Sequence, residues 1–263
     1  MKIFRYIGSK IRLLDYLSPP PKGTKRIVEL FAGSMCYGIK YCDLYKVLGI
    51  ELSERIYNIY DWLLNKPDLD KTLNEFNKYG KEHFDIRECE EFTDVEKDYI
   101  RLNCGSVFVG NVNKNVIYTS EKPLSPCVAQ TKKILEVAKG IEVLHGSCFD
   151  LYTPEDVKEG DLIFIDPPYE TSTELYGIKE SYTEMLKQYI NSLVKTGAPI
   201  IFTYGTDAPK LFPEYEWEYV KQEQVTVISK RLNNKVKRDE WVCYFNFNRR
   251  KREQYTQSLF EDD

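Results

Sequence analysis

Short apolar segments recur along the chain, and they are continuous rather than alternating, which is typical of strands buried on both faces of a parallel sheet. Helical patterns separate several of them: one spans residues 34–45, and another spans residues 183–197 and ends on a helix-stopping glycine. Strands that alternate with helices indicate an α/β, doubly wound domain. The expected strands are RIVELF (26–31), VLGIE (47–51), IEVLH (141–145), DLIFID (161–166) and PIIFTY (199–204).

Two regions break this rhythm. Residues 224–229 and 240–247 flank a polar, basic loop, so we expect an antiparallel hairpin at the sheet edge. Charged helical segments follow Glu51, and residues 105–120 then hold two β-like runs around a turn rich in Asn and Gly. The chain is therefore expected to contain a discontinuous main domain (1–55 and 140–250), an inserted subdomain (56–139) and a flexible tail (251–263).

Composition narrows the class of protein. Of 263 residues, 42% are hydrophobic and 14% aromatic, as in globular chains. The longest apolar runs are too short to cross a bilayer, and the N-terminus lacks the apolar core of a signal peptide, so we expect a cytoplasmic location. The seven cysteines form no C-x-x-C pair, and His83 and His145, the two histidines, are interpreted as ordinary structural or surface residues. No metal site is expected.

Charge is unevenly distributed, although the net charge is only −4. Residues 66–98 carry a net charge of −5, and residues 226–252 carry a net charge of +7. This asymmetry is compatible with a nucleic-acid-facing side on an acidic protein, although charge runs are usually just solvated faces.

The segment VELFAGSMCYG joins the first strand to a helix through small residues. Glycine at position 33 allows a close approach to a ligand, and a helix N-terminus favours a polar or anionic group, but a plain strand-to-helix turn explains the same pattern. Glu51 ends the second strand, where an acid can accept hydrogen bonds from ribose hydroxyls. A surface glutamate is the alternative. The two features together favour a nucleoside-cofactor site.

The segment DLIFIDPPY places Asp166 at the carboxyl end of a strand, where open α/β sheets bind ligands. The two prolines stiffen the turn, and neither can donate a backbone N–H. Asp166 and the Pro167 carbonyl can therefore both accept hydrogen bonds from one amino group, while Tyr169 can offer its ring face to a flat base. We favour a site for the exocyclic amino group of a nucleobase over a D-P-P turn with a core tyrosine.

The order of these motifs resembles that of the Dam-type family of DNA adenine methyltransferases, which use S-adenosylmethionine. The resemblance covers nearly the whole chain: RYIGSKIRLLDYL (5–17), then F-A-G, a long insertion, D-P-P-Y, and the closing VKRDEWVCYFNF (236–247). It implies a Rossmann-like methyltransferase sheet with an antiparallel C-terminal edge hairpin. The main domain would then be catalytic, and the inserted helical and β-hairpin subdomain would recognise the target.

The resemblance also implies a role for individual residues. Lys10 is a candidate cofactor contact on its own chemistry as well, because a cation in a tight glycine turn can bind the carboxylate of the methionyl end of S-adenosylmethionine. A surface lysine is the alternative. Asp166, Pro167 and Tyr169 would grip the target adenine. The product would be S-adenosylhomocysteine, and no metal is required. The implied cofactor contacts are Tyr6, Lys10, Phe31, Ala32, Gly33, Glu51, Cys148, Phe149 and Asp166.

The expected partner is double-stranded DNA, from which the target adenine is flipped out. Relatives that methylate GATC generally carry arginine in the corresponding hairpin, whereas this chain has none between Arg101 and Arg231, so the target sequence is left open. Arg249–Arg252 are further candidates for phosphate contacts. The candidates for contacts to base edges or phosphates are Asn103, Asn111, Asn113, Lys114 and Asn115 in the insertion, and Lys230, Arg231, Lys235, Lys237 and Arg238 near the hairpin loop.

Other partners are less well defined. The tail QSLFEDD (257–263) faintly resembles peptides that dock onto replication sliding clamps, but its leading glutamine is misplaced, and we favour a frayed terminus. We expect a nucleoid-associated monomer, and pairing with a restriction nuclease stays open. Two rival functions are an RNA methyltransferase, because D-P-P-Y also occurs in enzymes that modify guanine amino groups of ribosomal RNA, and an inactive cofactor-binding, DNA-binding protein. The Gly-Ser-Lys segment and the insertion favour DNA, and the intact D-P-P-Y favours an active enzyme.

Overall fold

The chain divides into two compact units, which are described separately. Unit 1 comprises Met1–Arg12 and Arg26–Leu151, and unit 2 comprises Leu13–Lys25 and Tyr152–Asp263. Unit 1 thus contains the expected insertion (56–139) as well as the first strands, so the contacts divide the chain differently from the expected domain boundaries, which stay a prediction. The computed structural model describes residues 3–4, 9–79, 83–104, 116–118, 123–168, 182–228 and 233–247.

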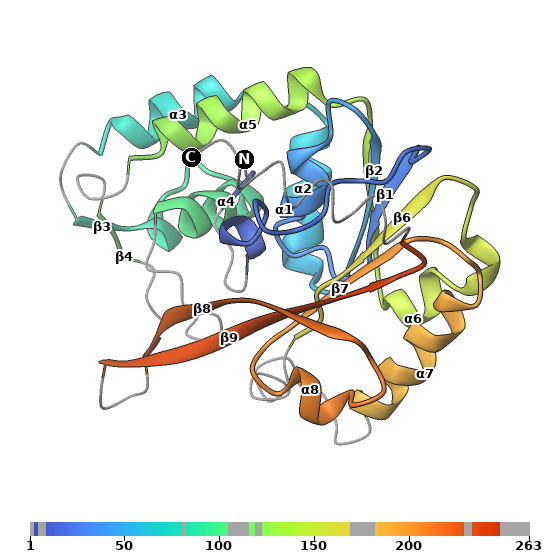
Figure 1. The fold of residues 1–263 in the computed structure, drawn as a ribbon. Helices are drawn as coiled ribbons and strands as arrows, with labels where there is room; N and C mark the ends of the chain where they lie inside the picture. The colour runs from blue at the N-terminus through green and yellow to red at the C-terminus, as the bar shows by residue number, and fades with distance from the viewer. Residues whose placement is uncertain are drawn as a thin grey trace, which may run out of the picture. The chain divides into compact units, whose positions relative to one another are not determined.

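Three parallel strands form the sheet of unit 1. They are β1 (Arg26–Glu29), β2 (Lys46–Glu51) and β5 (Ile141–His145), in the order β5-β2-β1. Figure 1 shows β1 beside β2. All three expected strands are confirmed, and β1 ends two residues earlier than predicted. The helix expected at 34–45 is shorter, because α1 spans only Cys36–Lys40 and turns follow it. The parallel register brings the carboxyl ends of the strands to one edge of this sheet.

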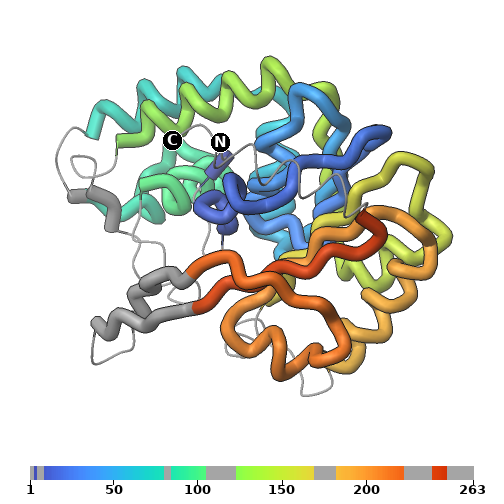
Figure 2. Tube along the Cα trace, in the orientation of Figure 1, coloured from blue at the N-terminus to red at the C-terminus, as the bar shows by residue number. Residues whose placement is uncertain are grey.

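Helices α2 (Glu54–Leu64), α3 (Leu69–Asn77), α4 (Asp94–Cys104) and α5 (Ser125–Val137) make up most of the rest of unit 1. Helices α3 and α5 lie side by side, as Figures 1 and 2 both show, and Lys132 of α5 pairs with Asp70 of α3 at 2.6 Å. Arg55 of α2 binds Asp98 of α4 through two of its guanidinium nitrogens. Short helical turns complete the unit at η1 (Lys10–Arg12), η2 (Ile86–Glu88) and α6 (Cys148–Leu151).

A separate two-stranded sheet lies within the expected insertion. Strand β4 (Val116–Tyr118) pairs antiparallel with β3 (His83–Asp85), and His83 lies opposite Tyr118. The second of the two expected β-like runs therefore contains a strand, and β3 is a partner that the sequence did not predict. The first run and its turn lie outside the described residues.

Unit 2 contains a four-stranded, mixed sheet. Its strands are β6 (Asp161–Ile165), β7 (Ile200–Tyr204), β9 (Asn233–Phe245) and β8 (Trp217–Ile228), in that order. Strand β6 pairs parallel with β7, whereas the other two pairings are antiparallel. The C-terminal hairpin is confirmed, and it begins seven residues earlier than the predicted 224. Helices α7 (Tyr182–Val194) and α8 (Ala208–Leu211) and the turn η3 (Pro154–Asp156) complete the unit.

The core of unit 2 is rich in aromatic residues. Phe202 of β7 contacts the rings of Phe212 and Trp217 at centroid distances of 5.3 and 5.0 Å, and Tyr215 contacts Phe245 at 5.0 Å. Aromatic pairs at such distances add about 0.5–1.5 kcal/mol each beyond the burial of their surface. This cluster holds the antiparallel hairpin against β7, so the strand that follows the D-P-P segment is rigidly placed.

The α/β class is confirmed. Among the described residues, the strands of the unit 1 sheet are parallel, and unit 2 combines a parallel pair with an antiparallel C-terminal hairpin. Helices precede or follow the parallel strands in both units. No helix in the described ranges is both long enough and apolar enough to span a membrane.

We expect Gly38→Ala to destabilise the protein. Alanine is favoured over glycine in a helix by about 1 kcal/mol, but a Cβ at position 38 would lie 2.6 Å from Cγ1 of Val47 and 3.0 Å from Oε1 of Glu29. Overpacking of a buried site costs about 1–3 kcal/mol, so the clash outweighs the gain in helix propensity. The midpoint of urea unfolding should fall. In the double variant with Val47→Ala, the losses in free energy of unfolding should be less than additive, because the shorter side chain removes the clash. Full additivity of the two losses would contradict the clash.

Candidate functional site

The loop after β1 makes a tight turn at the end of the sheet of unit 1. The amide of Ala32 donates to the carbonyl of Ile50 at 2.9 Å, which fixes the loop against β2. Gly33 (φ 46°) and Met35 (φ 44°) both adopt the left-handed conformation, which favours glycine. Glycine at position 33 therefore makes this turn possible, and its lack of a side chain fits the close approach of a ligand that the sequence predicts for this position.

Glu51 closes this turn from the neighbouring strand. Its Oε2 accepts a hydrogen bond from the Gly33 amide at 2.8 Å, and its Oε1 accepts one from the Ser53 amide at 2.8 Å. The residue is 6% exposed. Each carboxylate oxygen has a second lone pair, so the group can still accept hydrogen bonds from a diol. Gly33 and Glu51, which the sequence analysis assigned to one site, are thus joined by a hydrogen bond.

Burial raises the pKa of Glu51 above its ordinary value of 4.5, while the amides of Ser53 and Gly33 and the nearby His145 act in the opposite direction. His145 lies opposite Glu51 in the β2–β5 register, and its ring stacks on Tyr57 with centroids 5.1 Å apart. A raised pKa means that Glu51 binds its proton more tightly in the folded state. Its contribution to stability is therefore greatest below pH 4.5 and is lost as the pH rises through the folded-state pKa.

Binding of a ribose-containing ligand to this site should weaken on mild acidification. The ionised carboxylate is the better acceptor for two hydroxyl groups, and Glu51 loses its charge at a higher pH than an ordinary glutamate. Calorimetry with S-adenosylhomocysteine between pH 8 and pH 5 should show affinity falling before pH 4.5 is reached. Glu51→Gln removes the titrating group, so its weaker binding should change less with pH. An identical pH dependence in the two proteins would contradict this role for Glu51.

The Lys10 segment is attached to the same loop. The hydroxyl of Ser34 donates to the hydroxyl of Ser9 at 2.9 Å, and Lys10 begins η1 with only 5% of its surface exposed. The buried Tyr60 donates from its hydroxyl to the Gly33 carbonyl at 2.9 Å. Ser9, the residue before Lys10, is thus joined to the loop that contains Gly33, and Gly33 is joined to Glu51. Tyr6 lies outside the described residues.

Two aromatic side chains flank the strand ends of unit 1. The rings of Phe31 and Phe149 meet edge to face with centroids 6.2 Å apart, and both residues are half-buried. Burial raises the pKa of the neighbouring Cys148 thiol to about 12, so this cysteine is packed as an apolar residue and is no nucleophile at neutral pH. Ala32 is buried below the loop. The structure thus brings the predicted cofactor residues Phe31 and Phe149 together.

Asp166 follows the last residue of β6 in unit 2. Its Oδ1 accepts a hydrogen bond from the hydroxyl of Thr203 at 3.0 Å, and Thr203 is fully buried in β7. Asp166 itself is half-buried, Pro167 is buried and Pro168 is half-buried. The acid therefore lies at the end of a strand that is buried along its entire length, as the sequence predicted. Tyr169 lies outside the described residues.

Most of the residues predicted to contact DNA lie outside the described residues. Asn111, Asn113, Lys114, Asn115, Lys230 and Arg231 lie outside the described residues, as do Arg249–Arg252. The backbone of β9 contains Lys235, Lys237 and Arg238, which lie opposite Thr226, Gln224 and Glu223 of β8. Asn103 is buried in α4 at 1% exposure, and its Nδ2 donates to the Tyr99 carbonyl at 3.0 Å. Contact between Asn103 and a base would require this part of α4 to open.

Sequence reasoning overlooked three side chains that support the candidate sites. Glu29 accepts a hydrogen bond from the Gly38 amide at 2.6 Å and so fixes α1 to β1. Tyr60 holds the Gly33 carbonyl, and Thr203 holds Asp166. The burial of acid and hydroxyl groups within apolar segments is a signal that could have found Glu29 and Thr203, because buried polar groups require partners. Nothing in the sequence singled out Tyr60.

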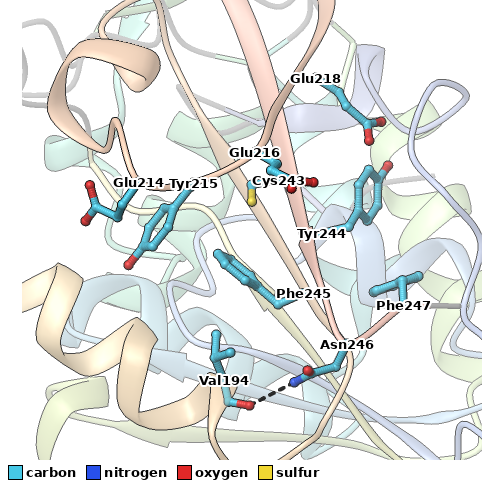
Figure 3. A pocket seen from close by; sticks show the side chains of 10 residues that line it. All are labelled: Val194, Glu214, Tyr215, Glu216, Glu218, Cys243, Tyr244, Phe245, Asn246 and Phe247. Carbon is cyan, nitrogen blue, oxygen red and sulfur yellow. Dashed lines mark hydrogen bonds between the residues drawn. The ribbon is translucent and has the colours of Figure 1, made fainter. Parts of the chain in front are cut away.

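Unit 2 also has a surface hollow of about 300 Å³ at the base of the hairpin. Figure 3 shows Tyr215 and Phe245 on one side of the strands, and Tyr244 with the carboxylates of Glu216 and Glu218 on the other. The amide of Asn246 closes one end by donating to the Val194 carbonyl at 2.9 Å. Because several glutamates line this hollow, it is unsuited to the phosphates of a nucleic acid.

Searches with the sequence found no matching family model and no matching curated protein. Solved structures with a similar fold include a putative methylase from Haemophilus influenzae (17% identity, 91% of this chain and 88% of that chain covered, TM-score 0.37). A second is precorrin-6y C5,15-methyltransferase from Geobacter metallireducens (11% identity, 90% of this chain and 87% of that chain covered, TM-score 0.38). A third is the tRNA m1G37 methyltransferase from M. jannaschii (13% identity, 92% of this chain and 49% of that chain covered, TM-score 0.36). At TM-scores below 0.5, these similarities establish neither the activity nor the substrate of this chain.

Proposed function

We propose that this protein is an S-adenosylmethionine-dependent methyltransferase that methylates the exocyclic amino group of adenine in duplex DNA. The observation that carries the proposal is the rigid acceptor turn at the end of β6. There Asp166 is fixed by Thr203 at 3.0 Å, and Pro167 follows directly. A prolyl residue has no N–H to donate, so an acidic side chain and the following carbonyl form a turn that only accepts hydrogen bonds. A primary amino group is the matching donor.

The loop of unit 1 supports the choice of cofactor. Glu51 offers a buried carboxylate for hydroxyl groups, Gly33 shapes the turn that Glu51 closes, and Phe31 and Phe149 supply aromatic surface. These residues fit a nucleoside, and Lys10 on the attached segment provides a cation for a carboxylate. The bound cofactor would supply an activated methyl group on a sulfonium.

The residues of this chain would act by positioning and by electrostatics. The lone pair of an adenine amino group is delocalised into the ring, so the nitrogen is a weak nucleophile. Two acceptors that hold both of its protons favour a tetrahedral nitrogen, whose lone pair can attack the methyl carbon. The cofactor, when bound, would supply the methyl group and keep the electron pair of its bond to sulfur, and the nitrogen would pass one of its protons through the Asp166 carboxylate to water. Asp166 needs neither a metal nor a covalent intermediate for this role.

Access to the amino group requires that the base leave the duplex. Unstacking costs about a few kcal/mol, and stacking on an aromatic side chain returns about 1–3 kcal/mol, which is the role proposed for Tyr169. The basic residues of the hairpin region would hold the phosphates, so DNA affinity should fall steeply with salt.

Transfer of a tritiated methyl group by the purified protein tests this function. Duplex DNA should accept label, and acid hydrolysis should release it as N6-methyladenine. Ribosomal RNA offered in parallel should stay unlabelled. Labelled guanine in RNA would replace the proposed substrate, and the absence of transfer to either nucleic acid by a cofactor-binding protein would contradict the proposed activity.

A further inference from the structure

Thr203 is a buried hydroxyl in an otherwise apolar part of β7. The strand reads IIFTY, all five residues are buried, and Thr203 has no measurable exposure. It lies opposite Val242 of β9, so its backbone is paired within the sheet of unit 2. Burial of a hydroxyl is costly unless it is hydrogen-bonded, whereas valine has nearly the same shape without that cost. A threonine at this position therefore needs a partner.

Asp166 is that partner. The register aligns Ile165 with Phe202, so the next residues of the two strands, Asp166 and Thr203, are neighbours. The Thr203 hydroxyl is 3.0 Å from Oδ1 of Asp166 and 3.4 Å from the Ile165 carbonyl. Its single proton belongs to the shorter contact, because a charged carboxylate is the stronger acceptor. A β-branched side chain has few rotamers, so this donor is held in a fixed direction.

We infer that Thr203 is a positioning residue for Asp166, whose carboxylate it holds in the orientation that receives the amino group of the substrate. This inference rests on the proposed function. The Thr203 hydroxyl donates to Oδ1 from one fixed side, which constrains where the carboxylate can accept the amino group of the substrate. Without Thr203 the carboxylate loses this constraint, and a misplaced acceptor slows a reaction that depends on geometry.

The test compares Thr203→Val with Thr203→Ser. Valine keeps the shape and removes the donor, so the melting temperature should change only slightly, because the lost hydrogen bond to Asp166 is offset by the burial of a methyl group in place of a hydroxyl. The kcat for methyl transfer should fall about tenfold or more, since small misplacements at a reacting centre can cost up to about 100-fold. The affinity for S-adenosylhomocysteine should change much less than kcat, because Asp166 is the one implied cofactor contact that Thr203 touches and those of unit 1 are unaltered. Serine keeps the hydroxyl, so it should restore much of kcat.

Two kinetic outcomes would overturn the inference. One is a wild-type kcat in Thr203→Val. The other is a loss of kcat in proportion to lost thermal stability and cofactor affinity, which would indicate a merely structural role.

A second readout does not depend on activity. Carbon-13 NMR of the Asp166 carboxyl group follows its protonation directly. A hydrogen bond to the charged form favours that form, so Thr203→Val should move the titration midpoint to higher pH, and Thr203→Ser should return it. If the wild type transfers no methyl group, the proposed function fails, and this titration still decides the role of Thr203. Identical midpoints in the wild type and Thr203→Val would overturn it.

Discussion

Replacement of Asp166 by alanine is expected to reduce methyl transfer by at least about 10²–10³-fold, the usual consequence of removing one preorganised polar group at a reacting centre. The amino nitrogen would lose its charged acceptor, while the buried strand below it would be unaltered. Single-turnover assays with tritiated methyl donor and duplex DNA would measure this loss.

The matched control is Asp207→Ala in the same unit. Asp207 precedes α8 and makes no capping hydrogen bond with its side chain, so its removal should leave transfer unchanged. Circular dichroism should show that both variants are folded. Turnover close to that of the wild type in Asp166→Ala would remove the basis of the proposed mechanism.

The second large effect is expected at Glu51. Glu51→Ala should weaken binding of S-adenosylhomocysteine about 10- to 150-fold, because a hydrogen bond to a charged group contributes about 1.5–3 kcal/mol. The variant would also leave the amides of Gly33 and Ser53 without their acceptor, which adds a loss of folding stability of about 1–3 kcal/mol.

The matched control for Glu51→Ala is Glu54→Ala, whose affinity for S-adenosylhomocysteine is measured by calorimetry in the same way. Glu54 begins α2 three residues later and is exposed, so its removal should not change cofactor affinity. Glu51→Gln separates the two effects, because it keeps the size of the side chain and one carbonyl acceptor while it removes the charge. Equal affinities in the wild type and Glu51→Ala would show that the carboxylate has only a structural role.

The parallel strands could be predicted because strands that are buried on both faces consist of continuous apolar runs in the sequence. The strand at 141–145 was found at its observed bounds, and that at 161–166 ends one residue earlier than expected. The length of the hairpin was underestimated because residues 217–223 (WEYVKQE) mix charged and aromatic positions, so no continuous or alternating apolar pattern marks them as part of the strand. Tyr219 nevertheless packs against Trp241 across the ladder, at a centroid distance of 5.3 Å.

The candidate site was partly predictable for a similar reason. Gly33 and Glu51 each follow a recognisable strand, and parallel strands bring such ends to one edge, so their proximity could be inferred. Thr203 could not be found this way, since threonine is an ordinary strand former and only the register between β6 and β7 places it beside Asp166. The role of Tyr60 depends on how α2 packs against the loop, which no local pattern specifies.

The central claim is that the protein methylates adenine in DNA, and a methylation map of a host genome tests it most directly. The protein should be expressed in a host that lacks adenine methylation, and the genome sequenced by a method that detects N6-methyladenine. We expect the modification at the copies of one short sequence in cells with the wild-type protein, and none in cells with Asp166→Ala. An unmodified genome in cells that contain the folded, cofactor-binding wild-type protein would contradict the claim.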